Sequence, residues 1–402
     1  MKRLKEGIYN TTEYYINEIK TILRDPGALL ILVLAMVMYP MFYSFAYVRE
    51  VVRDVPVAVV DLDHTVMSRQ CSRMLDATEQ ISVNSKPGSL KEAEQQFYDG
   101  KVKGVVLIPE NFEKNIFRGM PSSITVYSDA SYFLLYKQVL AGGAYAGGAL
   151  SGAIEVRRSL MEKKTMQQSI DQQDPLKTET FALYNPSAGY GTLVMPGMIL
   201  LIMQQTLLIG IGMLGGTIRR RSRYIHYAPQ VAGPMGTIPV VLGKASAYVT
   251  IYLFNALFAM VMLHSWLGFP DKSGFLPTLF LFVPFIFAVS FLGLTISVFF
   301  RDRAHSLMFF VFLSPLVLFF SGISWPTTAI PQLLYNTVGK LFPTTTMIPA
   351  YLRMRVGGAS LYDVKSEALF LLLQMVVYFV LACLAHKIMV KYISKHKPLE
   401  FS

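Results

Sequence analysis

The chain has 402 residues, of which 53% are hydrophobic and only 16% charged, and its mean hydropathy is +0.41. Several apolar stretches carry no ionisable side chain over about 20 residues, the length needed to span a bilayer. This composition excludes a disordered chain and an ordinary soluble enzyme. It indicates an integral membrane protein. The only cysteines, Cys71 and Cys383, are too far apart in sequence for a CxxC metal site, and they predict no disulfide framework.

Six segments are long and apolar enough to cross a bilayer as helices. They are Pro26–Val48, Leu193–Leu214, Ala245–Leu263, Phe275–Phe300, Ala304–Ser321 and Ala368–His386. We therefore expect an α-helical integral membrane protein with six transmembrane helices. Residues 26–48 form the first helix, and residues 189–390 form a region of five more.

Lysine and arginine are concentrated in four short segments that fall on one side of the membrane if there are six spans. These segments are the leader 1–25, the second-to-third connection 215–243, the fourth-to-fifth turn and the tail 391–402 with the residues just before it. They account for almost all of the formal net charge of +11. By the positive-inside rule, this side is cytoplasmic, so both termini are expected in the cytoplasm and the chain in the cytoplasmic (inner) membrane. The same distribution argues against nucleic acid as a partner.

Residues 49–188, between the first two spans, are expected to form an extracytoplasmic α/β domain. Buried strands are predicted at Val55–Asp61, Gly104–Pro109 and Ile124–Tyr127, and helices at Val66–Thr78, Ser89–Asp99 and Asn111–Arg118. One long helix is predicted from Ser131 to about Lys164. Its five glycines give a small-residue spacing that permits close helix packing.

The string VAVVDLDHT (Val57–Thr65) resembles the opening motif of haloacid-dehalogenase-type phosphatases. In that interpretation Asp61 is the nucleophile and Asp63 the general acid, with Mg²⁺ between carboxylates. The later lysine and second acidic pair that this chemistry needs are missing from the domain. The favoured interpretation is that the two aspartates end a strand and that Asp63 or Thr65 caps the next helix.

The leader and the second-to-third connection are the candidate contacts with a cytoplasmic partner. Leu4–Leu23 has the periodicity of an amphipathic helix at the membrane interface, with Leu4, Ile8, Tyr15, Ile19 and Ile22 on its apolar face. Arg24-Asp25-Pro26 then turns the chain into the bilayer. Simple anchoring and partner docking both fit this helix. The string GGTIRRRSR at Gly215–Arg223 fits topology enforcement, binding of anionic membrane lipids, or an acidic groove on a soluble partner.

Few polar groups lie within the spans, and none of them is ionisable at mid-depth. The candidate pathway residues are Gln204, Gln205, Thr206, Asn255 and Gln374. An ion-coupled carrier usually needs an intramembrane charge, so this pattern favours an amphipathic or lipid-like cargo moved by an external motor.

The outer loop 321–363, rich in proline and apolar residues, is expected to re-enter the outer leaflet. No GxxxxGK[ST] phosphate loop occurs, so any ATP must bind to another chain.

With these elements in place, the chain resembles permease subunits of type-2 ABC exporters, in the branch with a large extracytoplasmic domain between the first two transmembrane helices. The resemblance rests on the order of several strings: RDPGAL (24–29), VPVAVVDLDHTVMSR (55–69), GKVKGVVLIPENFEKNIFRG (100–119), ITVYSDAS (124–131), YNPSAGYGTLVMPG (184–197) and FFSGISWPTTAIPQLLYNTVGKLFPTTTMIP (319–349). It implies that the residues coupling the chain to an ATPase are Arg24, Asp25, Gly216, Thr217, Arg219, Arg220, Arg221 and Arg223.

The function implied is that of a non-catalytic permease subunit in an ATP-driven exporter of an amphipathic or hydrophobic cargo, such as a drug, a lipid or a cell-envelope component. No cofactor is expected on this chain, because ATP and Mg²⁺ would bind to the partner P-loop ATPase. A second copy or a similar permease, a periplasmic membrane-fusion adaptor and membrane lipids are the other expected partners. The alternative is a mechanotransmission or sensor subunit that acts on envelope partners without moving cargo.

Overall fold

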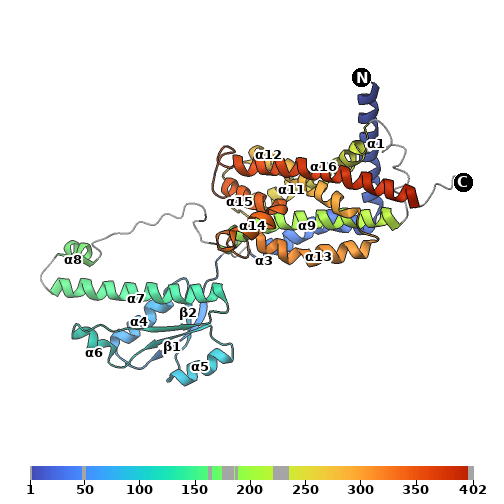
Figure 1. Ribbon diagram of the computed structural model, residues 1–402. Coiled ribbons are helices and arrows are strands. Elements are labelled where there is room, and N and C mark those ends of the chain that lie inside the picture. Colours follow the sequence, from blue (N-terminus) through green and yellow to red (C-terminus); the bar gives the residue numbers. More distant parts are fainter. Residues whose placement is uncertain are drawn as a thin grey trace. The chain divides into compact units, whose positions relative to one another are not determined.

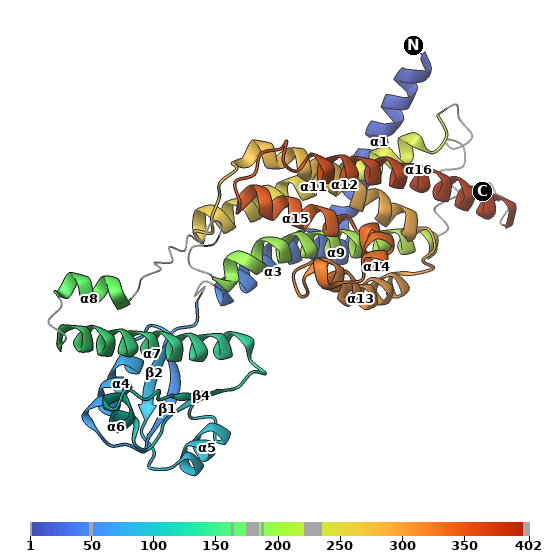
Figure 2. The same cartoon turned by 60° about the vertical axis from the view of Figure 1, so that its left-hand side comes forward.

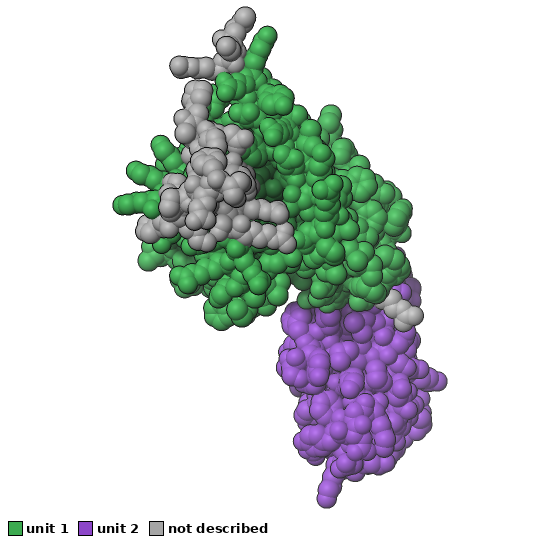
Figure 3. All heavy atoms as spheres, turned by 90° about the vertical axis from the view of Figure 1, so that its right-hand side faces the viewer, with its two compact units in different colours: residues 1–50, 182–402 green, residues 51–181 purple. Residues whose placement is uncertain are grey.

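The computed structural model describes residues 2–47, 51–161, 165–173, 185, 189–220 and 235–396. The chain divides into two compact units, which Figure 3 shows in different colours. Unit 1 comprises residues 1–50 and 182–402, and unit 2 comprises residues 51–181. Unit 2 is therefore inserted into the sequence of unit 1, as the sequence predicts.

Unit 1 is a helical bundle whose long helices run side by side in Figures 1 and 2. Its elements are α1 (Lys2–Arg24), α2 (Pro26–Leu29), η1 (Leu30–Leu34), α3 (Ala35–Ala46), α9 (Tyr190–Arg220), α11 (Ile238–Val261), η3 (Met262–Trp266), α12 (Phe275–Ser297), α13 (Arg303–Phe320), η4 (Thr327–Ala329), α14 (Gln332–Thr337), η5 (Gly339–Leu341), α15 (Pro343–Arg355) and α16 (Lys365–His396).

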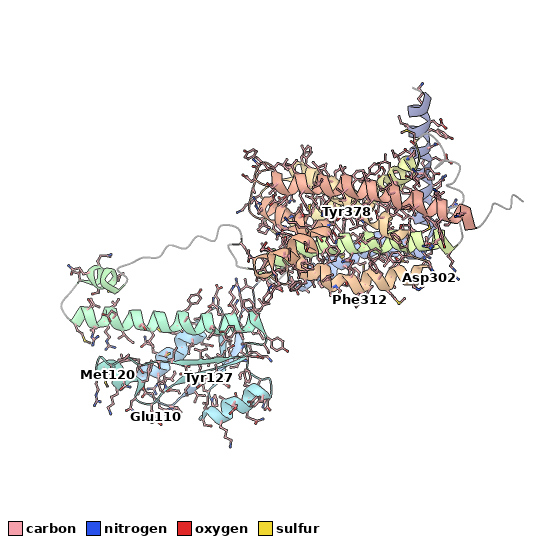
Figure 4. The ribbon with its side chains drawn as sticks, viewed as in Figure 1. Glu110, Met120, Tyr127, Asp302, Phe312 and Tyr378 are labelled. Carbon is pink, nitrogen blue, oxygen red and sulfur yellow. The ribbon has the colours of Figure 1, made fainter. Side chains whose placement is uncertain are left out.

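The helices of the bundle differ in how much of their surface is covered by protein. The most apolar stretch of α9 is 72% buried, whereas those of α13 and α16 are each 22% buried. Uncovered apolar surface of this extent is unusual in a soluble protein and normal for a helix that faces lipid. On α13 the most exposed of these side chains is Phe312, labelled in Figure 4. Within unit 1, six helical segments of the described residues can span a membrane by length and composition, and they match the six predicted spans.

The first of these segments, Pro26–Ala46, contains a wider π-helical stretch at Leu30–Leu34. Apart from Ala35, the residues that it buries recur every four positions: Ala28, Leu32, Met36, Pro40 and Ser44. An ordinary α-helix repeats every 3.6 residues, so a face with a period of four would turn steadily away from its neighbours. The π turn takes up part of this drift and keeps the stripe against the bundle.

The segment between α13 and α16 contains the short helices η4, α14 and η5 and the longer α15, and its re-entry into the outer leaflet stays a prediction. Two of its carbonyl groups accept hydrogen bonds from side chains of α16: the Gln374 amide donates to the Lys340 carbonyl at 2.7 Å, and the Tyr378 hydroxyl donates to the Leu341 carbonyl at 2.6 Å. Backbone of this kind is tolerated inside a membrane only when protein groups take its hydrogen bonds.

Unit 2 contains a four-stranded sheet in the order β2-β1-β3-β4. Its elements are β1 (Val55–Asp61), α4 (Val66–Asp76), β2 (Ile81–Ser85), α5 (Leu90–Tyr98), β3 (Gly104–Ile108), α6 (Phe112–Phe117), β4 (Thr125–Ser128), α7 (Phe133–Met161) and α8 (Met166–Gln173). The first three strands are parallel, and β4 is antiparallel to β3.

The two faces of β1 follow the period of two of a strand. Val55, Val57 and Val59 enter one apolar core with residues of α4 and α7, whereas Ala58 and Val60 enter a second core that includes Ala93 of α5. The sheet is thus covered on both faces. This agrees with the buried, almost continuously apolar sequence of a parallel strand.

Two sequence expectations for unit 2 need correction. Strand β2, between α4 and α5, is absent from the prediction because its sequence, ISVNS, is short and largely polar. Two of the glycines of α7, Gly142 and Gly143, pack against the sheet rather than against another helix: a Cβ at Gly142 would lie 2.9 Å from Ile81, and one at Gly143 would lie 2.7 Å from Val126. Helix α7 is a seventh helix apolar enough to span a membrane, but it covers the sheet of unit 2.

Candidate functional site

Three predicted coupling residues, Asp25, Gly216 and Arg219, lie at one end of unit 1. We call it the basic end and define it by Asp25, Arg219 and Arg303. Asp25 stands at the elbow where α1 stops and the first span begins. One of its carboxylate oxygens accepts a hydrogen bond from the backbone N–H of Ala28 at 3.0 Å and caps α2. The same oxygen forms an ion pair with the guanidinium of Arg303. Burial opposes the charge of Asp25, but the Arg303 hydrogen bond and the cap outweigh it and lower the pKa of this carboxyl.

The end of α9 lies against the turn between α12 and α13. A Cβ at Gly216 would lie 2.4 Å from the carbonyl oxygen of Asp302, so only glycine permits this approach. The Arg219 guanidinium donates a hydrogen bond to the Val298 carbonyl at 2.7 Å. The Thr217 hydroxyl instead donates within its own helix, to the Met213 carbonyl at 3.0 Å. Gly216 and Arg219 therefore join α9 to the α12–α13 connection.

The α12–α13 connection is itself held by Asp302. Its carboxylate caps α13 by accepting from the backbone N–H of His305 at 3.0 Å (Figure 4). Backbone and side-chain hydrogen bonds from His305 lower the pKa of Asp302. From the sequence, this turn indicates only topology. The partner of Asp302 is local, three residues on, whereas the partner of Arg303 is Asp25, 278 positions away.

A buried ion pair joins α1 to α11 near the basic end. The Lys244 ammonium lies 2.7 Å from a carboxylate oxygen of Glu18, and the Tyr248 hydroxyl donates to the other oxygen. Glu18 is 5% exposed and Lys244 is 3% exposed. His386 of α16 shares with these three side chains the lining of a cavity of about 10 Å³. Charges this deeply buried persist only when they are paired and hydrogen-bonded.

Helix α11 begins at Ile238, within the predicted 215–243 connection, so Lys244 lies inside a helix. Of the predicted apolar face of the leader, Ile22 is buried and Ile8 is 60% exposed. Tyr14 and Glu18, outside that predicted face, are also among the buried positions of α1. Helix α1 packs on α11 through this mixed face, where a Cβ at Gly243 would lie 2.5 Å from the Thr11 carbonyl oxygen.

The remaining predicted coupling residues have different positions. Arg24 and Arg220 are exposed near the same end of the bundle. Arg221 and Arg223 lie outside the described residues, as does the rest of the segment 221–234 of the connection. The structure therefore brings together Asp25, Gly216 and Arg219 and leaves the two arginines at the ends of α1 and α9 free to meet a partner.

The predicted pathway residues do not form one continuous polar line. The backbone N–H of Thr344 donates to Gln204 at 3.0 Å, and the Asn255 amide donates to the Leu32 carbonyl at 2.8 Å. The Tyr252 hydroxyl donates to Thr206 at 2.8 Å, and Gln374 binds the Lys340 carbonyl as described above. The Gln204 bond joins α9 to α15, and the Asn255 bond joins α11 to the π turn. The Tyr252–Thr206 bond joins α11 to α9, and the Gln374 bond joins α16 to η5. Four of the five side chains thus stabilise helix contacts.

Gln205 differs from the other four pathway residues. Both polar atoms of its side chain are buried and have no hydrogen-bond partner in the described structure. An amide left unpaired in an apolar surrounding costs about 1–3 kcal/mol. Among the five predicted pathway residues, it is the one whose side chain has both polar atoms available for a further hydrogen bond.

The end of unit 1 opposite the basic end contains a second buried cation. Arg355 is 2% exposed, lies 2.9 Å from a carboxylate oxygen of Asp271, and donates to the Gly274 carbonyl. Close by in sequence, Arg353, Leu352 and Gly358 line a cavity of about 570 Å³ together with Leu193 at the start of α9. No sequence signal identified this site.

In unit 2, Asp61 and Asp63 have structural partners. Asp61 accepts from the backbone N–H groups of Asp63 and His64 and from the Ser68 hydroxyl. Asp63 accepts from the backbone N–H groups of Phe112 and Glu113 at the start of α6. Partial burial opposes the Asp63 charge, but the Thr65 hydroxyl and these N–H groups outweigh it and lower its pKa.

The capping interpretation is confirmed at Thr65, whose hydroxyl accepts from the Ser68 N–H at the start of α4. Asp63 caps α6 instead of the following helix. Among the described residues, no group of three or more His, Cys, Asp or Glu side chains is arranged to hold a metal ion. The geometry therefore gives the Asp-x-Asp string a role in joining β1 to α4 and α6.

A model of a protein family described as "ABC-2 family transporter protein" matches residues 27–384, which is most of the chain. The chain belongs to the ABC-2 transporter family. This confirms the resemblance to an ABC permease, and it makes the protein a multi-pass membrane component of an ABC transporter. Members of the ABC-2 family are transport components, generally non-catalytic, and they work with a partner ATPase. Neither the curated proteins nor the solved structures gave a match.

Proposed function

We propose that this ABC-2 permease exports an amphipathic or hydrophobic cargo across the cytoplasmic membrane, driven by ATP hydrolysis on a separate subunit. In this proposal the basic end of unit 1 faces the cytoplasm and both termini lie there, while unit 2 is extracytoplasmic. This orientation in the membrane is supported by the concentration of lysine and arginine at the basic end. The absence of a phosphate loop in the sequence supports a separate motor.

The observation that carries the proposal is the linkage at the basic end. A force on α1 reaches α11 through the Glu18–Lys244 pair, and a force on the elbow reaches α13 through Asp25–Arg303. The contact of Gly216 with Asp302 and the Arg219–Val298 bond connect α9 to the same turn. One ATPase that presses on this end would therefore move helices α9, α11 and α13 together.

The cargo class is supported by the interior of the bundle. Apart from Gln205, the polar pathway side chains are engaged in helix contacts, and the buried charges lie toward the ends of the helices. A hydrophobic molecule with one polar group would match this interior better than an ion. The 570 Å³ cavity beside the start of α9 is a suitable exit region, next to the predicted re-entrant segment.

A dimer, formed with a second copy or a similar permease, is part of the proposal. The exposed apolar side chains of α13, among them Met308, Val311 and Phe312, give a face that a second permease could cover. Membrane lipids would cover whatever remains. A periplasmic adaptor that binds unit 2 is a further expected partner.

Coupling is tested by reversing the charge of Arg219, Arg220, Arg221 and Arg223 to glutamate. The complex is purified from native membranes, and the amount of co-purified P-loop ATPase is measured by mass spectrometry. We expect the yield of ATPase to fall at least about tenfold, because each repulsive contact costs several tenths of a kcal/mol or more at an interface. Reversal of the exposed Lys91 and Lys101 in unit 2 is the control. An unchanged yield, with topology verified by cysteine accessibility, would reject the coupling role.

Cargo export is then separated from mechanotransmission by the ATPase activity of the reconstituted complex. Candidate amphiphiles that raise the hydrolysis rate in wild-type protein, but not after Gln205→Leu, support export. A rate that no amphiphile changes, together with an envelope hydrolase bound to unit 2, supports the mechanotransmission alternative. In that case the engaged polar side chains of the spans would be only helix contacts.

A further inference from the structure

Unit 2 contains a cavity of about 410 Å³ between α7, α6 and the segment that leads from α6 to β4. Proteins hold small ligands in cavities of about 300–1,000 Å³. Apolar side chains form one part of the wall, with Phe112 and Ile116 from α6, Ile124 before β4, and Leu150 and Ile154 from α7, and polar residues form the rest. This lining suits a hydrocarbon chain.

Gly147 of α7 lines this cavity and has no side chain to fill it. A Cβ at Gly147 would meet only the Ile124 Cδ1 atom, at 3.7 Å, so a larger side chain there would extend into the cavity. By contrast, Gly142 and Gly143 on the same helix lie in tight contact with the sheet. Cys71 at the cavity wall is fully buried, and burial raises the pKa of its thiol to about 11, so it contributes a neutral, apolar surface.

One end of the cavity is basic. The Arg158 guanidinium lies 2.7 Å from the position that a Cβ would take on Gly119, a residue with φ of +74°. Glycine at 119 therefore provides both the backbone conformation and the room that this guanidinium occupies. In the described part of the chain, no carboxylate forms an ion pair with Arg158; Glu155, one turn earlier, shares the lining without pairing.

We propose that this cavity binds an amphiphile with one apolar chain and an anionic head group, with the chain between α6 and α7 and the head against Arg158. Met120, which is labelled in Figure 4 and 44% exposed, lies in the segment after α6 and also lines the cavity. The proposal concerns binding by unit 2. It goes beyond the transport function and does not require that the bound molecule is the exported cargo.

The test uses the full chain in nanodiscs of zwitterionic lipid, with a photoreactive dodecanoic acid that carries a diazirine on its chain. After irradiation, mass spectrometry measures labelling of the peptides that contain Phe112–Ile124 and Gly147–Arg158. We expect labelling of these peptides that unlabelled dodecanoic acid displaces. Gly147→Leu should abolish it by filling the cavity, whereas Gly148→Leu, at a neighbouring position with open space around it, should not.

The head-group assignment is tested with Arg158→Gln, matched by Arg157→Gln on the exposed neighbour. Because Arg158 is solvent-accessible, its pair with a carboxylate should contribute modestly, and we expect labelling to fall about two- to fivefold. A photoreactive dodecylamine should label these peptides less than the acid. Equal labelling by the amine would overturn the anionic assignment. Labelling that Gly147→Leu leaves unchanged, or no labelling in wild-type protein, would overturn the binding site.

Discussion

The two ends of unit 1 each contain a buried cation, and the two cations hold different kinds of structure together. At the basic end Lys244 is paired with Glu18, and both side chains are almost fully enclosed between α1 and α11. At the opposite end Arg355 is equally buried, but its partner Asp271 keeps 30% of its side chain exposed. The first pair joins two long helices. The second joins a helix to the connection between η3 and α12.

The two ion pairs differ in what remains when one of their two side chains is removed. An enclosed pair leaves an uncompensated charge that water cannot reach, whereas a partly exposed partner can be solvated. The basic end should therefore resist the separation of α1 from α11, and the opposite end should tolerate local rearrangement. This agrees with a bundle that receives force at one end and opens at the other.

The largest effect is expected from Glu18→Gln. Lys244 would remain buried opposite a neutral side chain, which costs about 3–5 kcal/mol. Thermal unfolding of the nanodisc-embedded protein should show a clearly lower Tm, whereas the exposed Glu13→Gln on the same helix should leave it unchanged. The double variant Glu18→Gln with Lys244→Met should recover most of the loss, because it removes both charges. If the double variant is as unstable as the single one, the ion pair is not the source of the effect.

A smaller effect is expected from Arg355→Met at the opposite end. Asp271 can then be hydrated, so the main cost is the lost hydrogen bond to the Gly274 carbonyl, about 1–3 kcal/mol. Arg353→Met provides the comparison, since its pair with Glu367 is about half exposed and worth about 0–1 kcal/mol. The same unfolding experiment measures both. Equal losses in the two variants would contradict the importance of burial at Arg355.

The smallest effect is expected from Asp25→Asn, and it should depend on pH. The folded-state pKa of Asp25 lies below the ordinary value of 3.8, so its ion pair stabilises the fold above that value and is lost as pH falls through the folded pKa. Asparagine still caps α2, so the variant should lose about 1 kcal/mol or less near neutral pH. The Tm difference from wild type should shrink as the pH falls below the ordinary value of 3.8 toward the lower folded-state pKa. A difference that is constant over this range would exclude the carboxylate charge as its cause.

Unit 2 could largely be predicted from the sequence because its signals are local. Val55–Asp61 is an apolar run closed by an aspartate, and the bounds of β1 follow directly from it. Thr65 and Ser89 mark the starts of α4 and α5 as side-chain caps. Strand β2 escaped prediction because only Ile81 of its five residues is buried.

The basic end could be predicted only in part, because its decisive contacts join distant residues. Asp25 was identified by its place before Pro26, but its partner Arg303 is 278 positions away. Glu18 resembles a solvated residue of an amphipathic helix, and nothing nearby reveals that Lys244, 226 positions later, neutralises it. Predictions from hydrophobic periodicity place charged residues on the solvent-facing side of a helix. The buried Glu18–Lys244 pair is an exception to this rule, so periodicity could not predict it.

The π turn at Leu30–Leu34 has a consequence for the elbow. Each residue of a helix turns the chain by about 100° around the helix axis, and this turn winds more residues than an α-helical turn does. A first span one residue shorter at this point would rotate Asp25 by about 100° relative to Met36 and carry the carboxylate away from Arg303. The π turn thus sets the direction in which Asp25 points around the helix axis. The Asn255 amide of α11 donates to the Leu32 carbonyl within this turn and so helps to fix that direction.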